Sequence, residues 1–170
     1  MTRETYNWAV DTLLDAYNEG KLKHGDCAAC AVGSLLNTPV WSYDFQTAYG
    51  EQYQTNDIHP DIREELGICN YYKDFLSKKE VSKIRNFLDN LYKKHGFTGT
   101  ELSQIEYSFE TSLGNEKEYD SLYKTKEGQF IGLTAVLKLM STMVTEDTIS
   151  EETINSNQER LVKVFEKVNI

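Results

Sequence analysis

The spacing of apolar residues is the feature of this sequence that most limits its fold. Apolar residues recur mostly every three or four positions and seldom alternate, which is the pattern of amphipathic helices. Proline, which breaks helices most strongly, occurs only twice in 170 residues, at Pro39 and Pro60. With 39% hydrophobic residues, a chain of this length can bury a core. The sequence therefore predicts an all-α fold: a single compact domain over residues 1–170, an irregular bundle of about six helices.

Apolar spacing and cap residues locate the expected helices. The predicted helical ranges are 5–18, 26–37, 41–49, two segments beginning near residues 77 and 98, 130–144 and 150–168. Ser77 with Glu80, and Thr98 with Glu101, have the spacing of capping boxes. Residues 51–77 and 114–128 read as connecting loops, the first with one turn of helix near Ile62. The range 130–144 is the most apolar, so we expect that helix to be central and buried.

Charge and hydropathy exclude several classes of partner. The formal net charge is −9, and nucleic-acid binding needs a concentrated basic surface, so no nucleic-acid partner is expected. No stretch approaches the roughly 18 apolar residues of a membrane span, so no membrane partner is expected. The first residues lack the apolar core of a signal peptide. We therefore expect a cytoplasmic protein, or a virion-associated one if it is phage-encoded.

A CxxC pair is the part of the sequence that comes closest to chemistry. Cys27 and Cys30 lie near the predicted start of the 26–37 helix, with Asp26 as the expected N-cap. Because the first turn of a helix carries unpaired N–H groups and partial positive charge, it favours a thiolate. The chain has three cysteines, an odd number that argues against a disulfide framework.

A metal site is one interpretation of these cysteines. Such a site needs about four ligands, and the sequence offers His24, Cys27, Cys30 and Cys69 for zinc or iron. Structural zinc sites usually show a second close pair of ligands, which is missing here. No cofactor is therefore expected, and zinc or iron remains an alternative.

Redox chemistry, nucleophilic catalysis and plain packing are the other interpretations. Thioredoxin-like domains place their CxxC after a strand, whereas a helix precedes it here. Papain-like enzymes also begin a helix with cysteine, but no base partner can be named for this chain, so no catalytic residue is assigned. A buried cysteine behaves as a small hydrophobic residue. The neighbouring Ala31, Gly33 and Ser34 are small as well, so close helix packing is the favoured interpretation.

These exclusions favour a non-enzymatic structural or protein-interaction module that binds a protein partner or self-associates. The expected contact surface is an aromatic segment comprising Trp41, Tyr43, Phe45, Tyr49 and Tyr53. The alternative function is a cysteine-centred metal-binding or redox protein that uses Cys27 and Cys30.

The CxxC segment also resembles a group of short bacterial and phage proteins that share a CxxCAVGN-type motif. Residues 30–33 match that motif, and Ser34 replaces its Asn. The likeness continues through Trp41, through residues 96–98 with Glu101, Leu102, Ile105 and Glu106, and through residues 132–133 with 135–136. Some of these proteins are labelled as the F subunit of a sodium-translocating NADH:quinone reductase. That label implies ferredoxin and flavin domains, whereas this chain lacks the four-cysteine run and the length. The resemblance therefore implies a recurring fold in bacteria or their phages without a defined role.

Overall fold

The computed structural model describes residues 1–26, 28–38, 59–68, 76–114, 122–145 and 148–168. It confirms the all-α class, with helices and no strand in these ranges. None of the described helices is long and apolar enough to cross a membrane. The helices are α1 (Arg3–Asn18), α2 (Ala31–Leu36), α3 (Pro60–Glu65), α4 (Lys78–Lys94), α5 (Gly99–Thr111), α7 (Lys126–Thr142) and α8 (Glu151–Val168).

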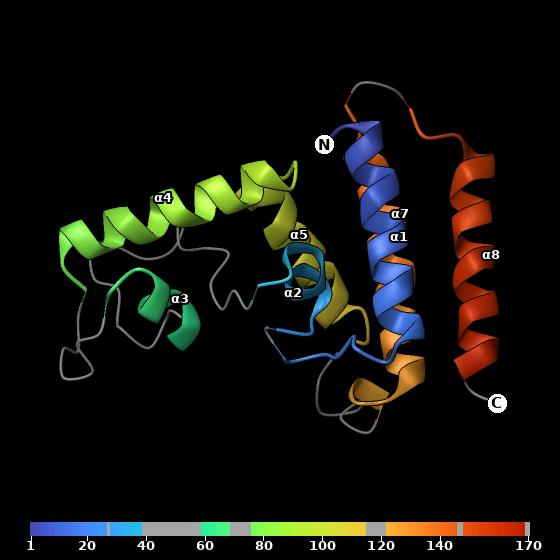
Figure 1. Cartoon of the computed structure of the whole chain (residues 1–170). Helices are drawn as coiled ribbons and strands as arrows, with labels where there is room; N and C mark the ends of the chain where they lie inside the picture. Colours follow the sequence, from blue (N-terminus) through green and yellow to red (C-terminus); the bar gives the residue numbers. More distant parts are fainter. Residues whose placement is uncertain (27, 39–58, 69–75, 115–121, 146–147, 169–170) are drawn as a thin grey trace.

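Three long helices, α1, α7 and α8, lie side by side and contact one another (Figure 1). On the other side of this group, α5 packs against α7, and the short α2 packs between α1 and α5. Helix α4 extends away from the group, with α3 beside it (Figure 1). Helix α7 therefore contacts α1, α5 and α8, as expected for the most apolar segment. Its buried side chains include Leu133, Val136, Leu137 and Met140.

Local signals placed most helix boundaries correctly. The predicted helices over 5–18 and 150–168 correspond to α1 and α8, and the turn of helix near Ile62 is α3. Helix α7 begins four residues before its predicted start at residue 130, because the side chain of Thr125 accepts a hydrogen bond from the backbone N–H of Gly128 at 3.1 Å. The predicted helix over 41–49 lies outside the described residues.

The predicted helix over 26–37 is the main correction. Helix α2 begins at Ala31, and its N-cap is Cys30 rather than Asp26. The carbonyl of Asp26 accepts hydrogen bonds from the N–H groups of Ala29 and Cys30 at 2.9 and 2.6 Å, so the chain turns there before the helix starts. Asn37, with φ of 49°, ends the helix in the left-handed conformation that asparagine tolerates.

Both predicted capping boxes are present, at the starts of α4 and α5. In α5 the hydroxyl of Thr98 accepts from the N–H of Glu101 at 3.2 Å, and the Glu101 carboxylate accepts from the N–H of Thr98 at 2.8 Å. Each bond satisfies a backbone donor that the first turn of a helix leaves without a partner.

Replacing Thr98 with alanine is therefore expected to destabilise the protein by about 1 kcal/mol. Urea denaturation followed by circular dichroism measures this change. A matched Thr142→Ala variant at the exposed end of α7 is expected to change stability by less than about 0.5 kcal/mol. Equal losses in the two variants would contradict a capping role for Thr98.

Candidate functional site

The structure describes two of the four residues predicted as metal ligands, His24 and Cys30. Both are buried, and the His24 side chain is fully enclosed. Cys27 and Cys69 lie outside the described residues. Among the residues that the structure describes, no group of three or more His, Cys, Asp or Glu side chains could hold a metal ion. The four-ligand zinc or iron site stays a prediction from sequence spacing.

Cys30 lies directly before α2, the short helix that packs against α1 and α5. Its backbone is extended, as an N-cap requires, and its side chain is fully buried. The sulfur accepts a hydrogen bond from the backbone N–H of Gly33 at 3.3 Å. A cysteine sulfur thus occupies the position that a serine or aspartate oxygen usually fills. The local fold holds the thiol in one place and in contact with the first turn of α2.

Glu106 of α5 meets the Cys30 thiol across the α2–α5 contact. The Glu106 carboxyl forms a side-chain hydrogen bond with Cys30 and also accepts from the backbone N–H of Val32 at 3.5 Å. Burial raises the pKa of Glu106 from the ordinary 4.5 to about 7, against the opposing effect of these hydrogen bonds. A carboxyl group that changes its protonation near neutral pH therefore lies against a buried thiol.

Glu110 lies one helical turn further along α5 and has different partners. Its carboxylate accepts from the Gly25 N–H at 3.0 Å and from the hydroxyl of Tyr123, and it lies 3.6 Å from Nδ1 of His24. Burial acts to raise the pKa of Glu110, but the contacts with His24, Tyr123 and Gly25 outweigh burial and lower it. Glu106 and Glu110 thus have pKa values displaced in opposite directions.

The His24 ring is held between two aromatic rings. It stacks on Phe109 with ring centroids 4.0 Å apart and an interplanar angle of 12°, and on Tyr123 at 4.6 Å. Helix α7 passes close behind: a Cβ added at Gly132 would lie 2.7 Å from Cδ2 of Phe109 and 3.0 Å from Cε1 of His24. Gly132 therefore permits the close approach of α7 to this stack. We call Cys30, Glu106, Glu110, His24 and Tyr123 the thiol–carboxyl cluster.

Comparisons with protein-family models, with curated proteins and with solved structures found no match to this chain. The resemblance to CxxCAVGN-type proteins stays a prediction. The thiol–carboxyl cluster is therefore the part of the described structure that best supports a function.

Sequence reasoning missed Glu106, Glu110 and Tyr123 as partners of the cysteine. One signal was present: Leu102, Ile105 and Phe109 form the buried stripe of α5, and the two glutamates follow the last two of these residues directly. Acidic side chains at the edge of a buried stripe can reach the core. Tertiary packing decides which element lies opposite these glutamates. The contact between Glu106 and Cys30 therefore could not be predicted from residue spacing.

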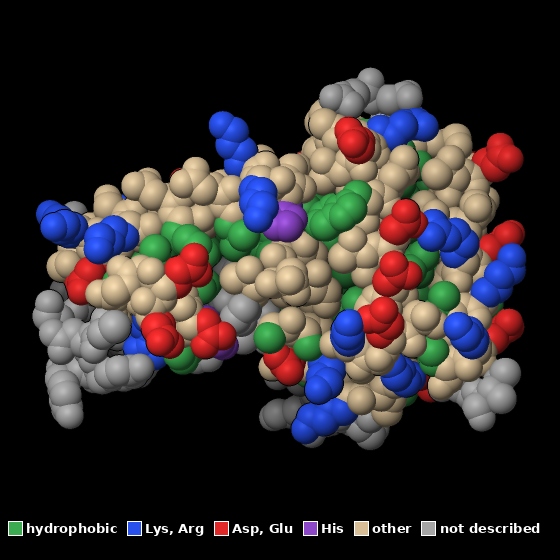
Figure 2. Space-filling model, in the orientation of Figure 1, with side chains coloured by type: hydrophobic (Ala, Val, Ile, Leu, Met, Phe, Trp, Pro, Cys, Tyr) green, Lys and Arg blue, Asp and Glu red, His purple; other side chains and the backbone are tan. Residues whose placement is uncertain are grey.

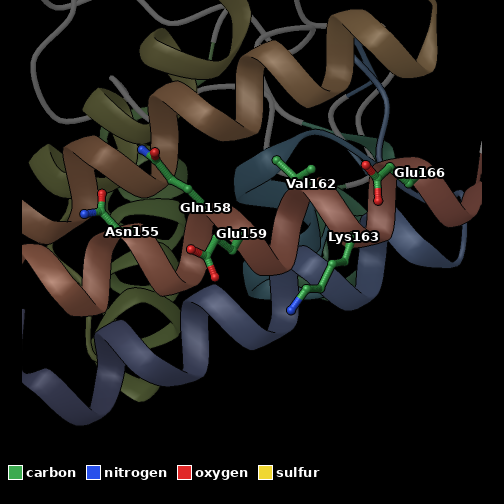
Figure 3. A pocket seen from close by; sticks show the side chains of 6 residues that line it. All are labelled: Asn155, Gln158, Glu159, Val162, Lys163 and Glu166. Atoms are coloured by element: carbon green, nitrogen blue, oxygen red, sulfur yellow. The ribbon is translucent and has the colours of Figure 1, made fainter.

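The predicted contact surface, Trp41, Tyr43, Phe45, Tyr49 and Tyr53, lies outside the described residues and stays a prediction. On the described surface, Figure 2 shows acidic and basic side chains interspersed over α1 and α8. A shallow groove of about 550 Å³ lies on α8 (Figure 3), lined by Asn155, Gln158, Glu159, Val162, Lys163 and Glu166. Five of these six side chains are polar or charged, which is typical of the solvated face of an amphipathic helix.

Proposed function

We propose that this chain is a cysteine-centred redox protein, in which Cys27 and Cys30 exchange with disulfides and Glu106 accepts the proton of Cys30. One observation carries the proposal: a buried thiol is hydrogen-bonded to a partly buried carboxyl whose pKa is raised by desolvation to about 7. A thiol attacks a disulfide as the thiolate, so its proton must leave first. A proton acceptor is most effective when its pKa lies near the working pH.

The proposed substrate class is a disulfide between two thiol compounds or two protein cysteines. The Cys27 thiolate attacks one sulfur of that disulfide, forming a mixed disulfide and releasing the first thiolate. Cys30 then gives its proton to the Glu106 carboxylate, and its sulfur attacks the Cys27 sulfur. The Cys27–Cys30 disulfide forms, and the second thiol leaves with the proton from Glu106. Two electrons pass from the two cysteines to the substrate, which is reduced to two thiols.

The burial of Cys30 suits the second step, in which its sulfur attacks the mixed disulfide at Cys27. A fully buried sulfur is protected from bulky disulfides in solution. The CxxC spacing provides a second thiol, Cys27, three residues earlier in the sequence. Cys30 is therefore assigned the resolving step, and Cys27 the first attack. This assignment agrees with the redox alternative that the CxxC spacing suggested.

Incubation with oxidised glutathione tests the proposal. Intact mass and peptide mapping are expected to show a Cys27–Cys30 disulfide. Cys30→Ser is expected to stop at a glutathione adduct on Cys27, and Cys69→Ser is expected to behave like the wild type. Glu106→Gln is expected to slow ring closure about 100-fold at neutral pH, because the proton acceptor is lost.

Two outcomes would contradict this function. One is a wild-type chain that keeps both thiols under oxidising conditions in which the denatured chain forms the disulfide. The other is zinc or iron bound in equimolar amount after purification without chelators, and lost from both Cys27→Ser and Cys30→Ser. That second result would support the metal-binding alternative.

A further inference from the structure

Helix α4 is basic, although the chain as a whole is acidic. Its 17 residues include six Lys or Arg and two Asp or Glu, a formal charge of +4, whereas the whole chain carries −9. Lys79, Asn86 and Lys93 follow one another at seven-residue intervals, and all three side chains are exposed. Positions seven residues apart drift by only about 20° around a helix, so these three form a line along one side of α4, which we call the basic stripe. Figure 2 shows basic side chains toward both ends of this helix.

Helix α8 has an acidic line of the same spacing. Three exposed glutamates follow one another at seven-residue intervals, and we call them the acidic stripe: Glu152, Glu159 and Glu166. Two cations of the same helix are turned toward α1, where Arg160 donates to the Asp11 carboxylate at 2.6 Å and Lys167 donates to Oδ1 of Asn18 at 3.4 Å. The glutamates are therefore left along the outer side of α8, where Figure 2 shows a row of acidic side chains.

The two stripes match in length and in the order of their groups. Each covers fourteen residues of helix, which is about 21 Å. When the helices lie side by side, the two lysines of the basic stripe come opposite the first and last glutamates of the acidic stripe. The amide of Asn86 then donates to the carboxylate of Glu159 in the middle. Because both patterns are symmetric about their middle residue, parallel and antiparallel helices match equally well.

A second copy of this chain is the occupant that these surfaces favour. Helices α4 and α8 lie at opposite ends of the molecule, so the stripes of one copy cannot meet each other (Figure 1). The groove on α8 also presents Val162, which is 41% exposed and lies among the charged side chains, as an apolar contact (Figure 3). A nucleic acid or an anionic bilayer on α4 would also meet the rest of the chain, which carries the remaining −13 and repels it.

We propose that α4 of one copy docks along the groove on α8 of a second copy, with the basic stripe against the acidic stripe. Because the two surfaces differ, the contact is heterologous, or head to tail. One residue of opposite sign lies beside each stripe, Asp89 on α4 and Lys163 on α8. Exposed ion pairs also contribute little each, so the association is weak and depends on salt. This contact does not require the proposed redox function.

Sedimentation equilibrium of the full chain with a thiol reductant present tests the contact, since no intermolecular disulfide can then form. At low ionic strength the wild type is expected to associate as its concentration rises. Lys79→Gln/Lys93→Gln and Glu159→Gln/Glu166→Gln are each expected to raise the dissociation constant about tenfold, and so is salt at about 0.5 M for the wild type. Glu4→Gln/Asp15→Asn changes two exposed acids of α1 instead and is expected to leave it unchanged.

Mixing the two stripe variants tests the head-to-tail geometry. Each variant keeps the stripe that the other lacks, so an equal mixture is expected to form a heterodimer with the affinity of the wild-type contact. Glutamine is a good helix former, so circular dichroism is expected to show unchanged helix content in both. A mixture that associates no more tightly than its components overturns the proposal.

Net charge makes the opposite prediction for one of these variants. Glu159→Gln/Glu166→Gln removes two negative charges from an acidic chain, so repulsion between whole molecules falls and association would strengthen. Stronger association in this variant than in the wild type therefore overturns the stripe contact. A wild type that stays monomeric at about 1 mM and low salt also overturns it, and leaves α4 to a different acidic protein.

Discussion

Replacing Phe109 with alanine is expected to destabilise the protein by about 3–5 kcal/mol, the largest effect of any single substitution considered. Phe109 is fully buried on α5 and stacks on the His24 ring. Truncation removes a large apolar side chain from the contact between α5 and α7 and leaves a cavity there. Urea denaturation at neutral pH measures the loss.

Tyr107 is the matched control for Phe109, because it is an aromatic residue of the same helix that is 72% exposed. Tyr107→Ala is expected to change the free energy of unfolding by less than about 0.5 kcal/mol. A loss below about 1 kcal/mol in Phe109→Ala would mean that α5 does not pack on α7 as the structure has it. Because Phe109 also supports His24, the same variant is expected to loosen the anchor of Glu110.

The stability of the wild-type protein is expected to fall, relative to Glu106→Gln, as the pH rises from about 4.5 to about 7. The pKa of Glu106 is raised from 4.5 to about 7 on folding, so within this window the folded protein binds the proton more tightly than the unfolded chain does. Stability therefore decreases with rising pH wherever the folded state holds more protons. Over this pH range the free energy of unfolding of the wild type is expected to fall by about 3 kcal/mol relative to that of Glu106→Gln.

Chemical denaturation of both proteins at several pH values checks this result. Comparing the two removes the contributions of groups that titrate equally in both. The lowered pKa of Glu110 acts in the opposite sense, since its stabilisation is lost as the pH falls. Glu152→Gln, which lacks a role in the cluster, is expected to follow the wild-type profile. Parallel profiles for the wild type and Glu106→Gln would contradict the burial of the Glu106 carboxyl.

Local signals carried most of the fold prediction. Capping boxes at Ser77 and Thr98 depend on side chains three residues apart, so they form wherever that segment becomes helical. The buried stripe of α5 and the apolar surface of α7 follow from helical periodicity in the same way. These features involve neighbours along the chain, and no distant contact is needed to recognise them.

The CxxC segment shows where local reasoning failed. Asp26 was the better N-cap by residue type, yet the turn that its carbonyl forms with Ala29 and Cys30 delays the helix to Ala31. Cys30 then caps α2 with its own sulfur and meets Glu106 from α5. Cys30 is buried, which is compatible with the favoured interpretation of a close packing contact, but that interpretation did not include its polar partner Glu106.

The amino-acid sequence determined the helical class and the caps of α4 and α5, because each depends on spacing within one segment. The tertiary structure decided that Cys30 faces Glu106, and that Glu110 is held by His24, Gly25 and Tyr123. Cys30 and Glu106 are far apart in the chain and meet only where α2 packs on α5. Burial at that contact gives the Glu106 carboxyl its raised pKa, since desolvation of a charged group depends on everything that surrounds it.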